Sequence, residues 1–286
     1  MTRPRVLVLG GTSRIAGMMR RWHPGGADVI WGARQGRGPG GPDWVQVDTR
    51  TDPAALAAAC AQVDVILDLS GPTNNPARAV AGFEAIPDLA RAVAHAARGK
   101  PLLWMSSAAV YGPRRNARED APRTPVSAYG RAKLRAEDDL IGRPGVTVLR
   151  LGNVAGADAL LGQARPGLSI RLDRFADGST PYRSYIGPKT LAESLFFLIG
   201  QAASGQVLPP VLNLSAPGPG VEMAALLKAA RLGFTLQTAP PEAVSAITLD
   251  TAALAALLPL PDELGTAAAI VADWRADRAR LREGRA

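Results

Sequence analysis

The sequence holds little of what disulfide bridges and metal sites require. Cys60 is the only cysteine among 286 residues, so it cannot form an internal disulfide and is expected to be a lone buried thiol. The only histidines, His23 and His95, lie far apart and lack the spacing of metal ligands. We therefore predict no metal site, and a chain of this length can bury a sufficient apolar core without such cross-links.

Long apolar runs and aromatic residues are also scarce. No stretch approaches the roughly 20 apolar residues of a membrane helix, and the apolar run at residues 6–9 is too short for a signal peptide. We therefore expect a cytoplasmic protein. The net charge is +8, from 33 basic and 25 acidic residues, but the basic side chains are scattered and no aromatic residues alternate with them. This balance favours a small anionic ligand over a nucleic acid or a membrane.

Strand patterns alternate with helix patterns in the first half of the chain. Strands are predicted at residues 5–9, 28–32, 44–47, 63–69, 101–105 and 146–151. Helices are predicted at residues 14–22, from Asp52 with Pro53 in the first turn, at 76–98 with a break at Pro87, and at 128–141. Apolar strands and this alternation predict an α/β fold with a doubly wound parallel sheet. Such sheets bind ligands at the carboxyl ends of their strands.

After about residue 155 the pattern becomes irregular. Residues 155–182 are predicted to be loop, and residues 190–199 a helix that packs back onto the sheet. Further strands are predicted at 211–214 and 235–238, and further helices at 221–230, 251–258 and 266–280. We therefore predict a cofactor-binding domain at residues 1–155, with residues 184–200 packed onto it, and a smaller C-terminal substrate-binding lobe at residues 156–286.

A glycine-containing turn follows the first predicted strand. Residues 10–16 read Gly-Gly-Thr-Ser-Arg-Ile-Ala and open the first predicted helix, which is the setting of a dinucleotide-binding loop. Backbone N–H groups at such a helix start can hold a pyrophosphate. The pattern is degenerate, because Ser13 or Arg14 takes the place of the second glycine and Ala16 that of the third. The Ser13 hydroxyl and the Arg14 charge can compensate for the missing glycine by contacting the phosphates. The alternative is a structural turn that binds no ligand.

The second predicted strand ends without a carboxylate. An acidic residue there binds the ribose hydroxyls of NAD, whereas an arginine can accept the 2′-phosphate of NADP. Arg34, together with Arg14 or Arg37, therefore favours NADP, the alternative being a solvated loop arginine. Asp48 is a candidate for the adenine amino group, or a plain turn residue. The cofactor contacts predicted in this part of the chain are Gly10, Thr12, Ser13, Arg14, Ile15, Arg34, Asp48, Leu69, Ser70 and Gly71.

Tyr129 and Lys133 are four residues apart and therefore share one face of a predicted helix. Reducing a carbonyl, or oxidising an alcohol, needs a group that gives or takes a proton as the hydride moves. A free tyrosine has a pKa of about 10, and a nearby ammonium lowers it toward neutrality. Ser107, at the end of the fifth strand, would hold the substrate oxygen. We predict Ser107, Tyr129 and Lys133 as the catalytic residues, with Tyr129 and Lys133 also contacting the cofactor.

Together these motifs resemble an extended short-chain dehydrogenase/reductase of the NAD(P)-dependent epimerase/dehydratase (nucleotide-sugar) type, which has a Rossmann cofactor domain. The resemblance is carried by residues 10–16, 67–71, 106–112, 129–133 and 150–154. It implies the same catalytic triad and places Gly152 and Val154 beside the cofactor. The expected substrate contacts are Asn75, Ala109, Asn153 and Arg183, the last in a region that resembles the family's substrate-phosphate site.

Three departures from the family pattern limit the reaction. Dehydratases of this type carry an acidic pair directly after the catalytic Ser/Thr, whereas this chain has Ala108 and Ala109, so sugar 4,6-dehydration lacks its acid and base. Many members have an aspartate after the Tyr-Ile strand, whereas this chain reads Gly187-Pro188-Lys189. The chain is also short for the family, so the substrate lobe is trimmed.

The motifs thus indicate NAD(P)-dependent hydride transfer at a hydroxyl or carbonyl carbon, in the first place by a nucleotide-sugar epimerase. An NADPH-dependent reductase of a keto-sugar or another small carbonyl compound is the alternative that Arg34 favours. A non-catalytic NADP-binding sensor is the alternative of another class, and the intact triad argues against it. The expected cofactor is NADP or NAD, with NADP favoured. The expected partners are a small anionic substrate and, for assembly, a second copy in a homodimer.

Overall fold

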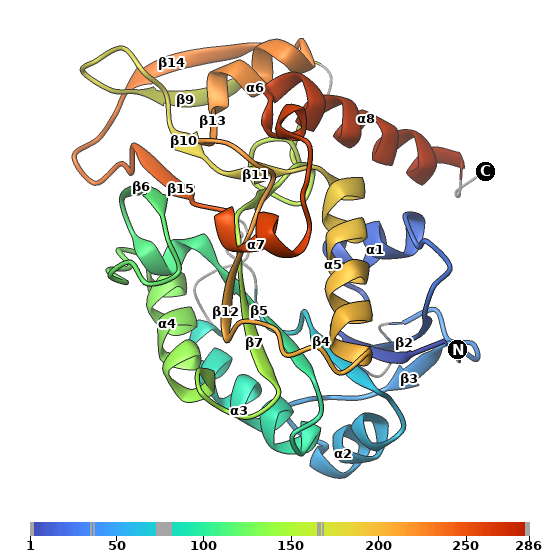
Figure 1. Cartoon of the computed structure of the whole chain (residues 1–286). Helices are drawn as coiled ribbons and strands as arrows, with labels where there is room; N and C mark the ends of the chain where they lie inside the picture. The colour runs from blue at the N-terminus through green and yellow to red at the C-terminus, as the bar shows by residue number, and fades with distance from the viewer. Residues whose placement is uncertain are drawn as a thin grey trace.

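A seven-stranded parallel sheet forms the centre of the computed structural model, which describes residues 3–34, 36, 38–72, 82–164, 167 and 169–283. The strand order is β12-β7-β5-β4-β1-β2-β3 (Figure 1). The strands are β1 (Arg5–Leu9), β2 (Asp28–Ala33), β3 (Trp44–Gln46), β4 (Val65–Asp68), β5 (Leu102–Ser107), β7 (Val146–Leu151) and β12 (Val211–Leu214). The order reverses beside β1, as the doubly wound topology requires. The predicted fold class is therefore confirmed.

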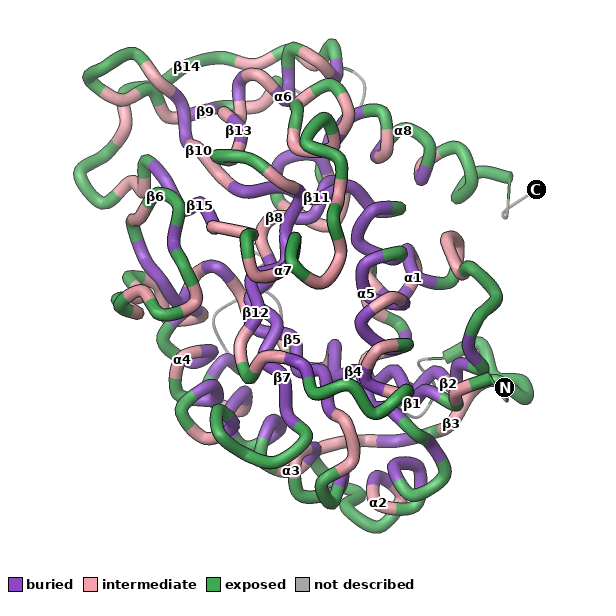
Figure 2. Tube along the Cα trace, in the orientation of Figure 1, coloured by how far each residue is buried: buried purple, intermediate pink, exposed green. Residues whose placement is uncertain are grey.

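Helices cover both faces of this sheet. On one face, Val6 and Val8 of β1 pack with residues of α1 (Arg14–Arg21) and α5 (Pro188–Ala203). On the other, Leu7 and Leu9 pack with α2 (Pro53–Ala61), α3 (Ile86–Ala97) and α4 (Ala128–Leu140). Successive side chains of a strand point to opposite faces, so both sets are buried, as the central strands in Figure 2 show. This double burial explains why the strands are apolar throughout.

A second region lies beyond the carboxyl ends of the strands. A four-stranded sheet there has the order β13-β10-β15-β6, and two strand pairs, β11-β8 and β14-β9, accompany it. These strands are β6 (Arg114–Ala117), β8 (Asn153–Val154), β9 (Ile170–Arg174), β10 (Tyr182–Arg183), β11 (Tyr185–Ile186), β13 (Val221–Glu222), β14 (Phe234–Thr238) and β15 (Ala246–Leu249). The helices are α6 (Met223–Ala230), α7 (Ala252–Leu257) and α8 (Ala267–Glu283), with short 3₁₀ turns η1 (Phe83–Ala85), η2 (Ala108–Tyr111) and η3 (Asp262–Gly265).

Helix α8 joins this second region to the helices on the α1/α5 face of the main sheet. Asp277 accepts hydrogen bonds from the Arg21 guanidinium at 2.8 and 2.7 Å and from Trp22 Nε1 at 2.9 Å. Asp273, one turn earlier, accepts backbone N–H bonds from Lys189 and Thr190 at 2.8 and 3.1 Å. The same α8 face thus contacts the end of α1 and the start of α5.

The prediction of residues 76–98 as one helix is wrong in the part that the structure describes, because α3 begins only at Ile86. Gly82 has a φ of 127°, and a 3₁₀ turn separates it from α3. Pro87 lies in the first turn of α3 and does not break it, since a first-turn proline removes no helical hydrogen bond. Asp52 caps α2 as predicted, accepting the Ala55 N–H at 2.8 Å.

The other differences lie after residue 155. Residues 155–182, predicted to be loop, contain β9 and the first residue of β10. Residues 211–214 form a strand as predicted, but β12 pairs with β7 at the edge of the main sheet. Which strand pairs with which is a tertiary property that a local pattern does not encode. We keep the division into two regions as a proposal, with residues 211–214 on the cofactor side.

Within the described ranges, no helix is both long and apolar enough to cross a membrane.

Candidate active site

The turn after β1 is shaped to bring backbone close to a ligand. Gly10 has a φ of 74°, and a Cβ on it would lie 2.6 Å from the Leu69 carbonyl oxygen, so only glycine fits. Ser13 has a φ of −68°, which any residue adopts, and its Oγ accepts the Ala16 N–H at 3.2 Å as the N-cap of α1. The missing second glycine therefore costs no backbone strain. Thr12 and Arg14 are exposed and Ile15 is half-buried along this loop.

Arg14 and Asp48 have local partners in the structure. Arg14 Nη1 donates to the Ala157 carbonyl at 3.3 Å, so the charge points toward the loop after β8. Asp48 Oδ1 accepts the Arg50 N–H at 2.9 Å, which is the turn role that the sequence left open. Adenine contact by Asp48 stays a prediction.

The carboxyl end of β2 carries arginine and no carboxylate. Ala33 ends the strand and Arg34 follows it exposed to solvent. Arg20 reaches the same edge from α1: its guanidinium lies 4.9 Å from the Trp31 ring centre and 5.2 Å from that of Trp44, and it donates to the Gly11 carbonyl at 2.5 Å. Sequence reasoning missed Arg20, because its place between Trp31 and Trp44 depends on the pairing of β2 with β3. Arg37, predicted to assist, lies outside the described residues.

The end of β4 supplies a free polar group beside the loop. The Ser70 hydroxyl is buried and has no hydrogen-bond partner among the residues that the structure describes. Gly71 has a φ of 104°, a conformation that favours glycine. A glycine cradle at Gly10, the start of α1 and this orphaned hydroxyl together fit a dinucleotide. Gly10, Ser70 and Gly71 would hold it.

Tyr129 and Ser107 are brought together by close packing of α4 on η2. A Cβ on Gly130 would lie 2.7 Å from the Ala109 carbonyl oxygen, so α4 can approach the turn after β5 only because residue 130 is glycine. Ser127 caps α4, accepting the Gly130 N–H at 3.0 Å. The Phe83 ring packs edge-on against Tyr129 at 5.4 Å between centres. The Ser107 hydroxyl lies close enough to Tyr129 to lower the pKa of its phenol against the effect of burial.

Lys133 lies deeper between α4 and the sheet. Its Nζ donates to the Met105 carbonyl at 2.7 Å and lies 4.3 Å from the Trp104 ring centre. Burial lowers the pKa of Lys133 to about 8, against opposing effects of Asp68 and Glu137. Burial also raises the pKa of Tyr129 to about 12, against the opposing effect of the Ser107 hydroxyl. The expected lowering of the Tyr129 pKa is thus not found here, because desolvation outweighs any effect of the Lys133 ammonium.

The remaining predicted residues are the substrate contacts Ala109, Asn153, Arg183 and Asn75 and the cofactor contacts Gly152 and Val154. Ala109 lies two residues after Ser107, and Ala109 and Asn153 are both half-buried. Gly152 packs against β11, since a Cβ there would lie 2.6 Å from the Ser184 carbonyl oxygen, and Val154 is buried. Arg183 donates to three carbonyls, those of Tyr182 at 2.6 Å, Val244 at 2.9 Å and Ser245 at 3.4 Å. Asn75 lies outside the described residues.

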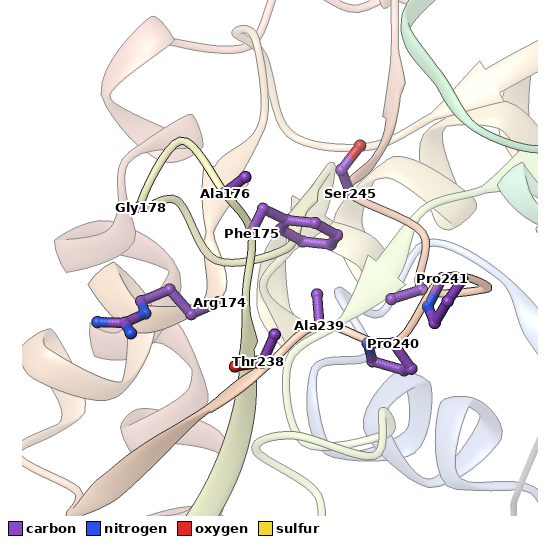
Figure 3. A pocket seen from close by; sticks show the side chains of 10 residues that line it. Arg174, Phe175, Ala176, Gly178, Thr238, Ala239, Pro240, Pro241 and Ser245 are labelled. Atoms are coloured by element: carbon purple, nitrogen blue, oxygen red, sulfur yellow. The ribbon is translucent and has the colours of Figure 1, made fainter.

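A cavity of about 670 Å³ lies next to Arg183 and was not foreseen from the sequence. It is formed by the loop after β9 and the loop between β14 and β15 (Figure 3). Its lining residues are Arg174, Phe175, Ala176, Gly178, Thr238, Ala239, Pro240, Pro241, Ala243 and Ser245. Ser245 joins the two features, because its carbonyl accepts from Arg183 and the residue lines the cavity. Phe175 is the one aromatic side chain in this lining, and Arg174, Thr238 and Ser245 are its polar side chains.

This fold and site define an NAD(P)-dependent enzyme of the oxidoreductase type. The chain belongs to the NAD dependent epimerase/dehydratase family, whose model matches residues 6–178, so the resemblance inferred from the motifs is confirmed. It is 29% identical over 236 residues to dTDP-6-deoxy-L-talose 4-dehydrogenase (NAD(P)(+)) of Kitasatospora kifunensis, an alignment that covers 73% of each chain.

Solved structures share the fold at lower identity. UDP-glucose 4-epimerase from Brucella ovis in complex with NAD has a TM-score of 0.77 at 20% identity, covering 94% of this chain and 97% of that one. An NAD dependent NDP-hexosamine 5,6-dehydratase involved in tunicamycin biosynthesis has a TM-score of 0.73 at 17% identity, covering 96% and 98%. These neighbours support the Rossmann-type architecture.

Proposed function

We propose that this protein is an NADP(H)-dependent dehydrogenase that reduces, and in reverse oxidises, one carbon of a nucleotide-linked sugar. The observation that carries the proposal is the arginine-lined end of β2. Arg34 follows the strand, Arg20 reaches it from α1, and Ala33 stands where a carboxylate would bind the NAD ribose. Two guanidinium groups at that edge favour a cofactor with an additional phosphate. An enzyme of this kind exchanges its cofactor in every turnover.

The state of the catalytic side chains supports the reductive direction. A bound nicotinamide would supply or accept the hydride. Because the pKa of Tyr129 is raised to about 12, its phenol is protonated at neutral pH and can donate a proton to a carbonyl oxygen. Ser107, beside Tyr129, would orient the same oxygen. The positive charge of Lys133 behind them would stabilise the phenolate that remains.

Support for a nucleotide-linked sugar comes from the second region. The relative from Kitasatospora kifunensis is named for a dTDP-linked deoxysugar. In this chain, Phe175 and two prolines line the cavity, and the guanidinium of Arg183 lies beside it. An aromatic ring can stack on a base, and a guanidinium can meet a phosphate. A small anionic substrate accords with the net charge of +8.

Epimerisation, which the sequence analysis ranks first, is the second candidate, and the matched family favours it. An epimerase oxidises a hydroxyl and reduces the ketone again on a cofactor that stays bound. The two functions therefore differ in net cofactor use.

The homodimer and the cytoplasmic location stay predictions.

Calorimetric titration of NADPH and NADH into the purified protein tests the proposal. We expect tighter binding of NADPH, and net NADPH oxidation with a dTDP-4-keto-6-deoxysugar as the substrate. Arg34→Asp should reverse the preference by removing one phosphate partner and adding a ribose acceptor, whereas the exposed Arg50→Asp should not. A protein that retains NAD through purification and interconverts sugars without net NADPH consumption is an epimerase and overturns the proposal.

A further inference from the structure

Two buried ionisable side chains lie on the same face of the sheet, one on the strand beside Trp104 and one close to its ring. Asp68 at the end of β4 is the register partner of Trp104 on β5, so both side chains project from the α3/α4 face of the sheet. Lys133 reaches the same place from α4, with Nζ 4.3 Å from the Trp104 ring centre. Asp68 is only 2% exposed and Lys133 only 5%. A carboxyl group and an ammonium group thus share a neighbour in the interior.

Neither group is satisfied by hydrogen bonds alone. Lys133 Nζ donates to the Met105 carbonyl, while an ammonium has three donors. Asp68 Oδ1 accepts the Ser70 N–H at 2.8 Å, but Oδ2 has no partner within the described part of the chain. A buried charge without an opposite charge nearby is costly. The geometry therefore favours mutual compensation between the two.

The other ionisable groups in this part of the interior are Cys60 on α2, Lys100, Tyr111 of η2, Arg123, Tyr129 and Glu137 on α4, and Arg150 on β7. Lys100 donates to the carbonyls of Cys60, Ala61 and Val63 at the other end of β4. Glu137 accepts from Arg150 Nη2 at 2.8 Å, so its charge has its own counterpart. Burial raises the pKa of Cys60 to about 11 and that of Tyr129 to about 12, which keeps both neutral. Burial also raises the pKa of Asp68, and the Ser70 N–H and the Lys133 charge oppose that rise, so Asp68 is the acid left to pair with Lys133.

We propose that Asp68 is a positioning residue whose carboxylate is the counter-charge that keeps Lys133 protonated inside the active site. Its effect on turnover rests on the proposed function, but the charge pair is testable without substrate or cofactor. Burial lowers the pKa of Lys133 to about 8, and Asp68 is the first of the two opposing influences. Without that carboxylate the pKa falls further, the amine is neutral at neutral pH, and the phenolate of Tyr129 loses its stabilising charge.

An NMR titration of the four lysines measures this directly. Protein labelled with ¹³C at lysine Cε gives one signal each for Lys100, Lys133, Lys189 and Lys228, and the spectrum of Lys133→Arg assigns the signal of interest. We expect Asp68→Asn to lower the Lys133 midpoint by at least about one pH unit, a tenfold change in the ammonium-to-amine ratio. The matched control is Asp64→Asn, an exposed carboxylate just before β4 that accepts the Arg5 N–H. It should leave the midpoint unchanged, and the exposed Lys189 and Lys228 serve as internal controls.

A double-mutant cycle keeps the proposal testable if Asp68→Asn folds poorly. Each of Asp68→Asn and Lys133→Met leaves one buried charge unpaired, whereas the double variant leaves none. We expect the double variant to unfold at higher urea than the summed effects predict, or to fold where a single variant does not. An unchanged Lys133 midpoint in folded Asp68→Asn, or additive effects in the cycle, overturns the proposal. If the parent protein shows the charge pair but transfers no hydride to or from a nucleotide-linked sugar, the proposed function fails while the charge pair stands.

Discussion

The carboxylate of Asp273 accepts two hydrogen bonds from Thr190, one from its backbone N–H and one from its hydroxyl, although 83 positions separate the residues. It also accepts the N–H of Lys189 at 2.8 Å. Helix α5 begins at Pro188 after Gly187, and neither residue has a side chain that can cap it. The aspartate that the family pattern places after the Tyr-Ile strand is absent, and α8 supplies a capping carboxylate instead.

Asp273→Ala should lower the free energy of unfolding by about 1–2 kcal/mol, as loss of a capping carboxylate does. The start of α5 is partly buried, so its N–H groups cannot all turn to water. Urea denaturation followed by circular dichroism measures the change. Asp262→Ala, an exposed acid in η3 ahead of α8, is the control and should stay within about 0.5 kcal/mol of the parent. Equal effects of the two substitutions would contradict the cap.

Glu137→Gln should destabilise the fold by about 3–5 kcal/mol, because it leaves the buried Arg150 charge without its partner. Arg150 Nε and Nη2 both donate to Glu137, and the two side chains are almost fully buried. Thermal and chemical unfolding measure the loss. The neighbouring Asp138→Asn is the control, since Asp138 pairs with Arg123 in an exposed position and should matter by less than about 1 kcal/mol. A small effect at Glu137 would mean that Arg150 finds another acceptor.

Tyr129→Phe should reduce turnover by at least about 100-fold while cofactor affinity stays unchanged, because it removes only the proton donor. Tyr182→Phe on β10 removes a comparable hydroxyl outside the triad and should retain activity. The pH dependence follows from the raised Tyr129 pKa of about 12. Since the phenol stays protonated below that value, the rate of reduction should not decline through deprotonation of Tyr129 between about pH 6 and pH 8. A Phe variant with near-normal turnover would remove Tyr129 from the chemistry.

The sequence predicted those features of the fold and the site that depend only on residues close together in the chain. The glycine at residue 10, the cap at Asp52 and the spacing of Tyr129 and Lys133 depend on residues within one turn or one strand end. Arg20 escaped notice because its stacking on Trp31 and Trp44 requires knowing that β2 and β3 are neighbours. The catalytic roles of Ser107, Tyr129 and Lys133, and the binding roles of the other site residues, stay predictions.

The remaining features depend on elements far apart in the chain. The cavity at Phe175 joins two loops separated by more than 60 positions, and the Asp273 cap joins residues more than 80 positions apart. Asp68 is an acid inside the strand predicted at residues 63–69, and its position beside Trp104 follows from the register of β4 with β5. The low pKa of Lys133 and the high pKa of Tyr129 arise from burial, which no spacing reports.

The contacts of α8 have a consequence for the order in which the molecule is completed. Arg21 at the end of α1 has its hydrogen-bond acceptor in Asp277, 256 positions later in the chain. The start of α5 has its acceptor in Asp273. During synthesis, the strands of the nucleotide-binding sheet leave the ribosome long before the acids that fasten the helices on its α1/α5 face. Nascent chains that stop short of residue 273 would therefore carry α1 and α5 packed on the sheet but without these contacts at their ends, where local opening is easier until α8 emerges.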